Sequence, residues 1–347
     1  MKLSFRWYGL SDSIPLEFIS QIPGMQSVVT SLYSKKPGEK WDLEELLALK
    51  EEAASKGLKM EVIESIPVSE DIKSGTAKRD EHIEVFKHNL ALCGQAGVKC
   101  VCYNFMPVFD WLRTDLCHYN PDGSTSLSYS REDFAKVDPK NLHLPGWDES
   151  YSPDELQGLL DRYSKISHEE LFANLVYFLK AIMPICDQCD INMAIHPDDP
   201  PWDVFGLPRI LSKEADIDRL FEAVPNPHNG LTLCTGSLGA GRFNDIPHLA
   251  GKYAKMKRIP FAHLRNVKYV GSEDSFVEAG HYSKMGSLDM AEIVSQLVKN
   301  GFDGYVRPDH GRNIFGETGK PGYGLYDRAL GCAYINGLFE MAEKKGK

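Results

Sequence analysis

The chain has 347 residues, of which 42% are hydrophobic and 25% are charged, a balance typical of a globular protein with a large core. Its formal net charge of -10 at pH 7 provides no long-range positive field for nucleic acid or an acidic membrane surface, so we expect a small-molecule partner. No run approaches the roughly 20 apolar residues that span a bilayer, and the first residues have no apolar signal core, which predicts a cytoplasmic protein.

The first half of the chain alternates short apolar runs with longer amphipathic stretches. These patterns predict strands over 2–7, 27–32, 59–65 and 98–105, and helices over 15–22, 42–56 and 80–96. A strand followed by a helix is a βα unit, and three complete units precede the fourth strand.

The fourth predicted strand is followed by a long segment before the next helix, which begins at about residue 168. The segment 106–167 is rich in Pro, Asp, Ser, Tyr and Trp. Loops of this length are uncommon unless they are functional, and this one leaves the carboxyl end of a strand. We therefore expect an inserted cover over a substrate site, with an oligomer contact as the alternative.

The second half of the chain continues the alternation. We predict strands over 191–196, 231–235, 259–265 and 304–309, and helices over 213–223, 246–255, 288–300 and 326–344. Eight strands alternating with helices favour parallel pairing and closure into one barrel. The predicted fold is α/β, a single-domain (β/α)8 TIM barrel over 1–347 with the inserted segment after strand 4.

Each of the last four predicted strands ends on a residue that can bind a metal. In a barrel the carboxyl ends of neighbouring strands converge on one mouth, where inward side chains can meet around one ion. Two imidazoles, a thiolate and a carboxylate suit a divalent cation. The predicted metal ligands are His196, Cys234, His263 and Asp309.

Several segments resemble those of the mannonate dehydratases, a family of xylose-isomerase-like TIM barrels. They read A-I-H-P-D-D-P-P, L-C-T-G-S-L-G, F-A-H-L-R-N-V and V-R-P-D-H-G-R, and the N-terminal F-R-W-Y-G and the Y-N-F-M-P-V-F-D-W-L-R-T-D-L segment are similar too. The resemblance implies a hydro-lyase that dehydrates D-mannonate to 2-keto-3-deoxy-D-gluconate in hexuronate (glucuronate) catabolism. It also implies Mn²⁺ or Fe²⁺ as the cofactor, held by the four residues named above.

The same resemblance assigns an acid–base pair. One member is His310, and the other is a tyrosine that we place at Tyr323, with Tyr326 close enough in sequence to be the alternative. The pair would divide removal of the C2 proton from protonation of the leaving C3 hydroxyl, in an order that the sequence leaves open. A homodimer or higher homo-oligomer fits the family.

Substrate recognition requires a cation for the carboxylate of a sugar acid and polar groups for its hydroxyls. Arg265 has the same strand parity as His263, so both should face one way, and it is our first candidate for the carboxylate. Arg307 lies deeper and should instead pair with Glu61 or Glu64. Weaker candidates at strand ends are Asn266, Arg312, Trp7 and Asn104.

Two further motifs have ordinary interpretations. The glycines of 236–241 match no nucleotide-binding spacing, so we expect them to let the chain turn tightly over the metal mouth. The C-x-x-C of Cys186 and Cys189 ends a helical stretch, where packing is the expected role. The alternative functions are a metal-dependent sugar isomerase or epimerase on the same barrel, and a sugar-acid-binding protein without catalysis.

Overall fold

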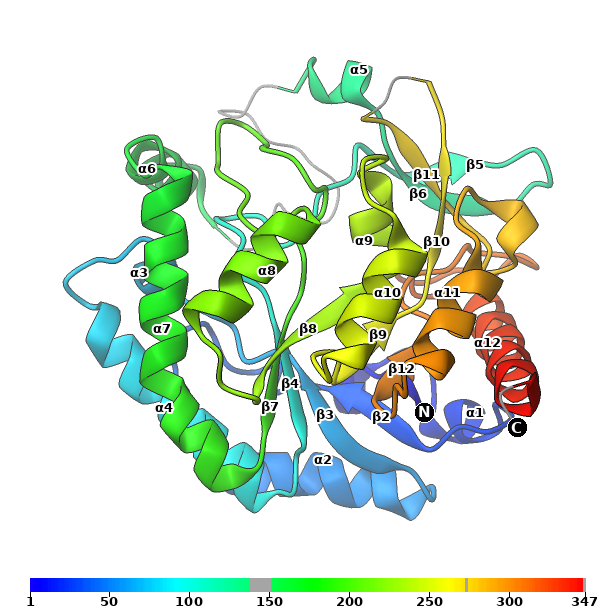
Figure 1. Cartoon of the computed structure of the whole chain (residues 1–347), viewed down its shortest axis with the longest axis horizontal. Helices are drawn as coiled ribbons and strands as arrows, with labels where there is room; N and C mark the ends of the chain where they lie inside the picture. Colours follow the sequence, from blue (N-terminus) through cyan, green and yellow to red (C-terminus); the bar gives the residue numbers. More distant parts are fainter. Residues whose placement is uncertain (138–150, 272–273, 346–347) are drawn as a thin grey trace.

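The computed structural model of the chain describes residues 1–137, 151–271 and 274–345. Eight parallel strands close into a barrel in the order β1-β12-β9-β8-β7-β4-β3-β2, with helices around it (Figure 1). The predicted α/β barrel is confirmed. Its strands are β1 (Lys2–Arg6), β2 (Ser27–Thr30), β3 (Lys59–Glu64), β4 (Cys100–Tyr103), β7 (Asn192–Ile195), β8 (Asn229–Cys234), β9 (Phe261–His263) and β12 (Tyr305–Arg307).

The barrel strands are apolar on both faces because one face packs inside the barrel and the other packs against helices. Every residue of β2, β4, β8, β9 and β12 is buried. This continuous burial is typical of parallel sheets that are covered by crossover helices. One cluster of buried side chains from six barrel strands comprises Val29, Val62, Cys100, Cys102, Ala194, Phe261 and Tyr305.

The outer helices largely follow the predicted stretches. Helix α7 begins after Ser167, whose side chain and that of Glu170 form a capping box, and α2 is followed by Gly57 at φ 74°, a left-handed position that suits glycine. The longer helices are α2 (Leu43–Ser55), α4 (Arg79–Gln95), α7 (His168–Cys189), α8 (Glu214–Ala223), α10 (Ile246–Lys255), α11 (Met290–Lys299) and α12 (Tyr326–Lys345), and α1 (Leu16–Ser20) is short.

A second, antiparallel sheet lies outside the barrel, at the top of Figure 1, and the sequence patterns did not predict it. Its order is β10-β11-β6-β5, which joins two strands of the inserted segment to two strands that follow β9. The four strands are β5 (Asp115–Tyr119), β6 (Thr125–Tyr129), β10 (Asn266–Tyr269) and β11 (Phe276–Ala279). The inserted segment is therefore anchored to the carboxyl end of the barrel rather than being a structureless loop.

The described part of the inserted segment also contains two helices, α5 (Arg131–Phe134) and α6 (Pro153–Tyr163). Its middle part, 138–150, on which part of the predicted cover falls, lies outside the described residues. Short elements elsewhere are α3 (Glu70–Lys73), η1 (Gly9–Ser11) and η2 (Ser283–Met285). Among the residues described, no helix has the length and apolar character needed to cross a membrane.

The glycines of 236–241 do not make the tight turn that we predicted. Residues Thr235–Ala240 form a short buried helix, α9, directly after β8. A Cβ atom on Gly236 would lie 2.6 Å from side-chain atoms of Arg265, so the absent side chain makes room for that guanidinium. The reason for this glycine is close packing against an arginine, which a single sequence does not reveal.

Candidate metal and acid–base centre

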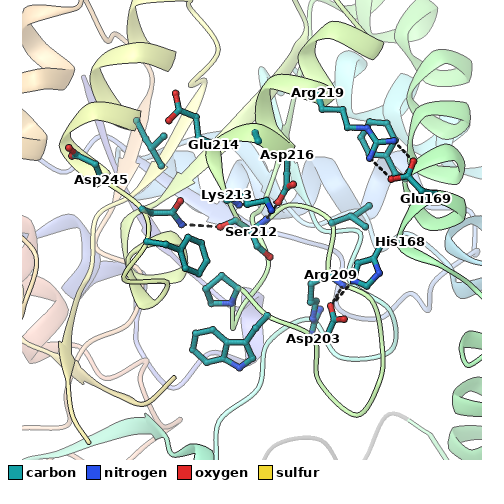
Figure 2. Close-up of a pocket in the computed structure, with 18 residues that line it drawn as sticks. His168, Glu169, Asp203, Arg209, Ser212, Lys213, Glu214, Asp216, Arg219 and Asp245 are labelled. Carbon is teal, nitrogen blue, oxygen red and sulfur yellow. Dashed lines mark hydrogen bonds and ion pairs between the residues drawn. The ribbon is translucent and has the colours of Figure 1, made fainter. Parts of the chain in front are cut away.

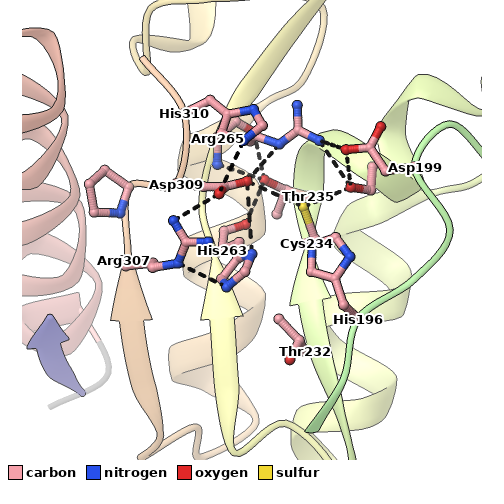
Figure 3. Close-up of polar contacts among 12 residues, drawn as sticks. His196, Asp199, Thr232, Cys234, Thr235, His263, Arg265, Arg307, Asp309 and His310 are labelled. Carbon is pink, nitrogen blue, oxygen red and sulfur yellow. Dashed lines mark hydrogen bonds and ion pairs between the residues drawn. The ribbon is translucent and has the colours of Figure 1, made fainter. Parts of the chain in front are cut away.

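The four predicted metal ligands come together at the carboxyl ends of β7, β8, β9 and β12 (Figure 3). Ligand atoms of His196, Cys234 and His263 lie within 4.8 Å of one another. Asp309 Oδ2 lies 3.7 Å from Cys234 Sγ and 3.8 Å from His263 Nδ1. Two ligands of one tetrahedral zinc-like ion, each roughly 2.0 to 2.3 Å from it, would be separated by about 3.3 to 3.8 Å.

The two histidines differ in what their ring nitrogens contact. His196 Nδ1 lies 2.7 Å from the carbonyl oxygen of Pro197, so it donates there. The ring also hydrogen-bonds to Cys234, and Nε2 is the nitrogen that could bind a cation after it loses its proton. His263 Nδ1 is buried and has no hydrogen-bond partner among the described residues. A buried nitrogen without a partner is costly unless it meets a ligand. The donor set therefore fits a divalent metal ion.

The charges around this centre favour the ionised forms of its acidic members. Burial opposes ionisation of Cys234, but the charges of Arg265 and His196 hold the pKa of its thiol well below the usual value. Burial likewise opposes ionisation of Asp309, and Arg307 is the main group that holds the pKa of this carboxyl well below its usual value. The thiolate and the carboxylate are both forms that bind metals.

A second group of potential ligands shares one histidine with the first. It comprises Glu64, Cys102 and His263. However, Glu64 already forms ion pairs with Arg6 at 3.1 Å and with Arg307 at 2.8 Å, as predicted for Arg307. Burial raises the pKa of the Cys102 thiol, which therefore keeps its proton. The first group is the better metal site.

Asp309 has an unusual backbone conformation for a residue that is not glycine. Its φ is 59°, in the left-handed region, directly after β12. Such a conformation costs of order 1–3 kcal/mol and persists only where the surrounding structure enforces it. Here Arg307 Nη1 and Arg265 Nε each lie 2.8 Å from a different oxygen of the Asp309 carboxylate. The two arginines hold this carboxylate over the barrel mouth.

His310 and Tyr323 lie in contact at the edge of the same mouth. His310 Nε2 is 3.0 Å from Tyr323 Oη, and the two rings meet edge to face with their centroids 5.0 Å apart. Tyr326 instead begins α12, is 48% exposed and contacts Phe315. Of the two tyrosines considered from the sequence, the structure brings Tyr323 to His310.

A cavity of about 510 Å³ opens above these residues. His196, Asp309, His310 and Tyr323 line it, whereas Cys234 is fully buried and is not among the lining residues. The remaining lining residues include cations, carboxylates, aromatic side chains and the predicted Asn104. Several were not predicted: Arg6, Tyr8, Tyr33, Asp110, Trp111 and Lys320. The cavity therefore combines the candidate metal site and the candidate acid–base pair with three cationic side chains, those of Arg6, Arg307 and Lys320.

A larger cavity of about 800 Å³ lies near the N-terminal ends of α7, α8 and α10 (Figure 2). Two ion pairs join side chains that line it, His168 with Asp203 and Glu169 with Arg219. Neither of the potential metal-binding groups found among the described residues lies there. The smaller cavity is the candidate active site because it holds the reactive groups.

Arg265, our first candidate for the substrate carboxylate, does not line the active-site cavity. Its guanidinium is buried and contacts Glu278 Oε1 at 2.5 Å and Asp199 Oδ2 at 2.7 Å, besides Asp309. Arg265 lies near His263, as its strand parity predicted. A buried arginine needs a partner of opposite charge, however, and three carboxylates of the protein already pair with this guanidinium. This prediction is corrected.

Three weaker predictions about substrate contacts also need correction. Asn266 is buried and holds the backbone of Leu288, Arg312 pairs with Asp327 and Asp122, and Trp7 packs in the main core. None of the three lines the active-site cavity, whereas Asn104 does. A position at the end of a strand is therefore insufficient, because the next residues can face the core or a helix.

The arginines behind the metal site form a buried cluster with two carboxylates. Arg113, from the inserted segment, lies 2.7 Å from Asp199 Oδ1 and 2.6 Å from Glu278 Oε1, and Arg265 contacts the same two residues. Glu278 Oε1 also lies 3.0 Å from His310 Nδ1. Residues far apart in sequence thus meet through one charge network.

Replacing Arg113 with leucine should destabilise the protein strongly. The substitution leaves Asp199 and Glu278 buried with one cation fewer, and breaking a buried ion pair costs roughly 3–5 kcal/mol of unfolding free energy. Denaturant unfolding followed by fluorescence measures this loss. Arg131→Leu, in an arginine that is exposed on α5 and paired with Asp274, is the matched control. Equal losses in the two variants would contradict the prediction.

Comparisons with known proteins identify the family of the chain. The family model for D-mannonate dehydratase (UxuA) matches residues 1–347. A mannonate dehydratase of Thermotoga petrophila is 49% identical over 359 residues, covering 100% of this chain and 99% of its own length. The crystal structure of mannonate dehydratase from Streptococcus suis serotype 2 has a TM-score of 0.93 at 46% identity, covering 100% of this chain and 96% of that one.

A more distant structure shares the fold alone. A xylose isomerase-like TIM barrel protein from Mycobacterium smegmatis, solved in complex with magnesium, has a TM-score of 0.59 at 12% identity and covers 99% of this chain and 97% of its own. The likeness to the mannonate dehydratases extends over the full length and includes the strands whose ends form the candidate centre. The chain therefore belongs to the D-mannonate dehydratase family.

Proposed function

We propose that this protein dehydrates D-mannonate to 2-keto-3-deoxy-D-gluconate. The observation that carries the proposal is the contact between His310 and Tyr323, 3.0 Å apart at the cavity that opens over the four-donor centre. The reaction removes the C2 hydrogen as a proton and the C3 hydroxyl as water, and the enol that forms becomes the ketone. Two proton-transfer groups at one anion-binding cavity match these needs.

The metal would be held by His196, Cys234, His263 and Asp309, and Mn²⁺ or Fe²⁺ is our prediction for its identity. When bound, a divalent cation there supplies Lewis-acid stabilisation for negative charge that develops on the substrate carboxylate. The protein's own contribution is to keep the thiol and the carboxyl ionised through Arg265 and Arg307. The mixed N, S and O donor set suits first-row divalent ions.

The surroundings of the two proton-transfer residues suit them to different proton transfers. Burial and the nearby Asp309 raise the pKa of Tyr323, so its hydroxyl keeps its proton near neutral pH and suits donation to the leaving C3 hydroxyl. His310 Nδ1 faces the Glu278 carboxylate, which leaves Nε2 to accept the C2 proton. We therefore assign the base to His310 and the acid to Tyr323.

The substrate carboxylate is attracted by positive charge in the same cavity. Arg6 and Lys320 line it, and the Lys320 ammonium lies 3.9 Å from the centroid of the Tyr8 ring. The inserted segment contributes Asp110 and Trp111 to the lining. We propose that 106–167, within one domain of 1–347, covers the bound substrate, and that the protein acts in the cytoplasm as a homodimer or higher homo-oligomer.

Removing the charge of Lys320 should weaken substrate binding more than catalysis. Lys320→Met is expected to raise KM about tenfold with kcat within about threefold of wild type, since a hydrogen bond to a charged group contributes roughly 1.5–3 kcal/mol. Desolvation, aided by nearby Arg6, lowers the pKa of Lys320 to about 8, so the wild-type kcat/KM should fall as pH rises through that value.

Steady-state kinetics across pH 6 to 10 measure both effects. Lys320→Arg keeps its charge to higher pH and should move the alkaline fall upwards. Lys299→Met, at an exposed lysine at the end of α11 that does not line the cavity, is the matched control. An alkaline fall that is identical in wild type, Lys320→Met and Lys320→Arg would contradict a role for this ammonium.

Turnover of D-mannonate tests the proposed function directly. Protein purified under reduced, anaerobic conditions and loaded with Mn²⁺ or Fe²⁺ should form a 2-keto-3-deoxy acid, detected by a colour reaction for the keto product, and chelator should abolish it. A panel of other aldonic acids defines the substrate range. Absence of product with both metals would refute the proposal, and conversion of an aldose to a ketose without loss of water would favour the isomerase alternative.

A further inference from the structure

Glu278 is a buried carboxylate that contacts the proton-transfer pair from outside the barrel. It lies on β11 of the second sheet and is 2% exposed. Its Oε1 is 3.0 Å from Nδ1 of His310, and the opposite nitrogen of that ring, Nε2, is 3.0 Å from Tyr323 Oη. Glu278, His310 and Tyr323 therefore form a continuous hydrogen-bonded chain that ends at the active-site cavity.

The surroundings of Glu278 keep it ionised. Burial alone would raise the pKa of this carboxyl, but Arg265, His310 and Arg113 hold it below the usual value. Oε1 accepts from Arg265 Nη1 at 2.5 Å and from Arg113 Nη2 at 2.6 Å. Because an ionised carboxylate has no proton to donate, Nδ1 of His310 must be the donor in their contact. In neutral His310, Nε2 then carries the lone pair.

We propose that Glu278 is a positioning residue that fixes the ring orientation and tautomer of His310, so that Nε2 is the nitrogen that exchanges protons with substrate. The inference rests on the proposed function. An imidazole that is free to rotate or to change tautomer would present the wrong nitrogen for part of the time. A carboxylate that two arginines hold in place removes this freedom without becoming a proton acceptor itself.

The second sheet brings this carboxylate to the barrel mouth. β11 pairs with β6 of the inserted segment, with Phe276 opposite Tyr129 and Val277 opposite Ser128. The same segment supplies Arg113, which contacts Glu278. The inserted segment therefore also supports the residue that orients His310. This role is separate from that of a cover.

Glu278→Gln is the first test, because the amide keeps the shape of the side chain and loses its charge. We expect kcat on D-mannonate to fall about 10- to 100-fold, the range for loss of a partner that orients an active-site ligand or base, with KM within about threefold. Metal content and melting temperature are measured on the same preparations. A wild-type kcat in a folded, metal-loaded Glu278→Gln would overturn the proposal.

A double-mutant cycle separates positioning from a structural effect. If Glu278 acts through His310, then in the His310→Asn background Glu278→Gln should change kcat by less than about threefold. Asp199→Asn is the matched control, because Asp199 contacts the same two arginines, Arg113 and Arg265, and in the described part of the chain forms no hydrogen bond or ion pair with His310. Its effect on kcat should multiply with that of His310→Asn.

The remaining outcomes are each decisive. If the fold losses in kcat from Glu278→Gln and His310→Asn multiply in the double variant, the proposal is overturned. It is also overturned if the losses from Asp199→Asn and His310→Asn do not multiply, because the loss would then belong to the arginine cluster. If Glu278→Gln does not fold, Glu278→Asp is the second variant, because it keeps the negative charge but moves it away from His310. It should lower kcat by a similar factor, and a wild-type kcat in Glu278→Asp would also overturn the proposal. Wild-type protein that makes no keto product with either Mn²⁺ or Fe²⁺ would instead refute the proposed function itself.

Discussion

His310→Asn should lower kcat on D-mannonate by about 10³-fold while the protein keeps its metal. A positioned acid or base contributes roughly 10²- to 10⁴-fold, and asparagine fills similar space without a nitrogen that exchanges protons near neutral pH. Tyr323→Phe, which removes only the hydroxyl at 3.0 Å from His310 Nε2, should have an effect of the same order. Keto-product formation and metal analysis on the same samples measure the two quantities.

Tyr326→Phe provides the matched control for the tyrosine. Tyr326 is three residues further along, is 48% exposed and does not line the active-site cavity, so loss of its hydroxyl should leave kcat within about twofold of wild type. Full activity in both His310→Asn and Tyr323→Phe would contradict our catalytic assignment. Loss of metal in either variant would instead indicate a structural role at the metal site.

Cys234→Ser should abolish stable metal binding and turnover together. The thiol is fully buried among His196, His263 and Asp309, and its low pKa makes it the thiolate that a divalent ion binds. A serine hydroxyl keeps its proton near neutral pH and is a poor substitute. Loss of a direct ligand should exceed the roughly 10- to 100-fold loss in metal affinity that removal of an outer partner causes.

Titration of metal-free protein with Mn²⁺, followed by calorimetry, measures this affinity. Cys189→Ser is the control, since that thiol lies at the end of α7, is half-buried and belongs to neither group of potential ligands found among the described residues. Cys189→Ser should bind metal like wild type. Unchanged affinity in Cys234→Ser would remove the thiolate from the ligand set.

The barrel could be predicted because each of its parts has a local pattern. Parallel strands are buried on both faces and therefore appear as short continuous apolar runs, and helices such as α10 follow amphipathic periodicity so closely that the observed Ile246–Lys255 matches the predicted range. The candidate ligands were found for a related reason. His196, Cys234 and Asp309 stand at or just beyond strand ends, and a barrel brings those ends together.

The second sheet could not be predicted because its pairing is not local. β11 meets β6 across about 150 residues of sequence, and each strand is too short, and too interrupted by polar residues, to stand out as a strand of the barrel. Glu278 was missed for the same reason, since nothing near it in the sequence marks it as a partner of His310. The one unusual feature of this segment in the sequence is a single acidic residue, Glu278, within a short run that is otherwise apolar and that the structure buries.

Substrate contacts were the least predictable feature. Strand parity placed Arg265 beside His263 but could not show that Asp199, Glu278 and Asp309 would occupy its guanidinium. The cations that do line the cavity, Arg6 and Lys320, come from β1 and from the loop before α12. Which side chains of a loop reach a cavity depends on tertiary packing, and periodicity has no information about it.

The pairing between β1 and β12 joins the first strand of the chain to the last. Lys2 of β1 lies opposite Tyr305 of β12, and Leu3 opposite Val306. During synthesis β1 therefore emerges from the ribosome roughly 300 residues before its second neighbour exists, and at about 5–20 residues per second it waits for at least 15 seconds. A contact between residues so far apart in the sequence slows folding. The edges of the sheet stay exposed until β12 has been made and pairs with β1, so the nascent chain must be protected from aggregation until then.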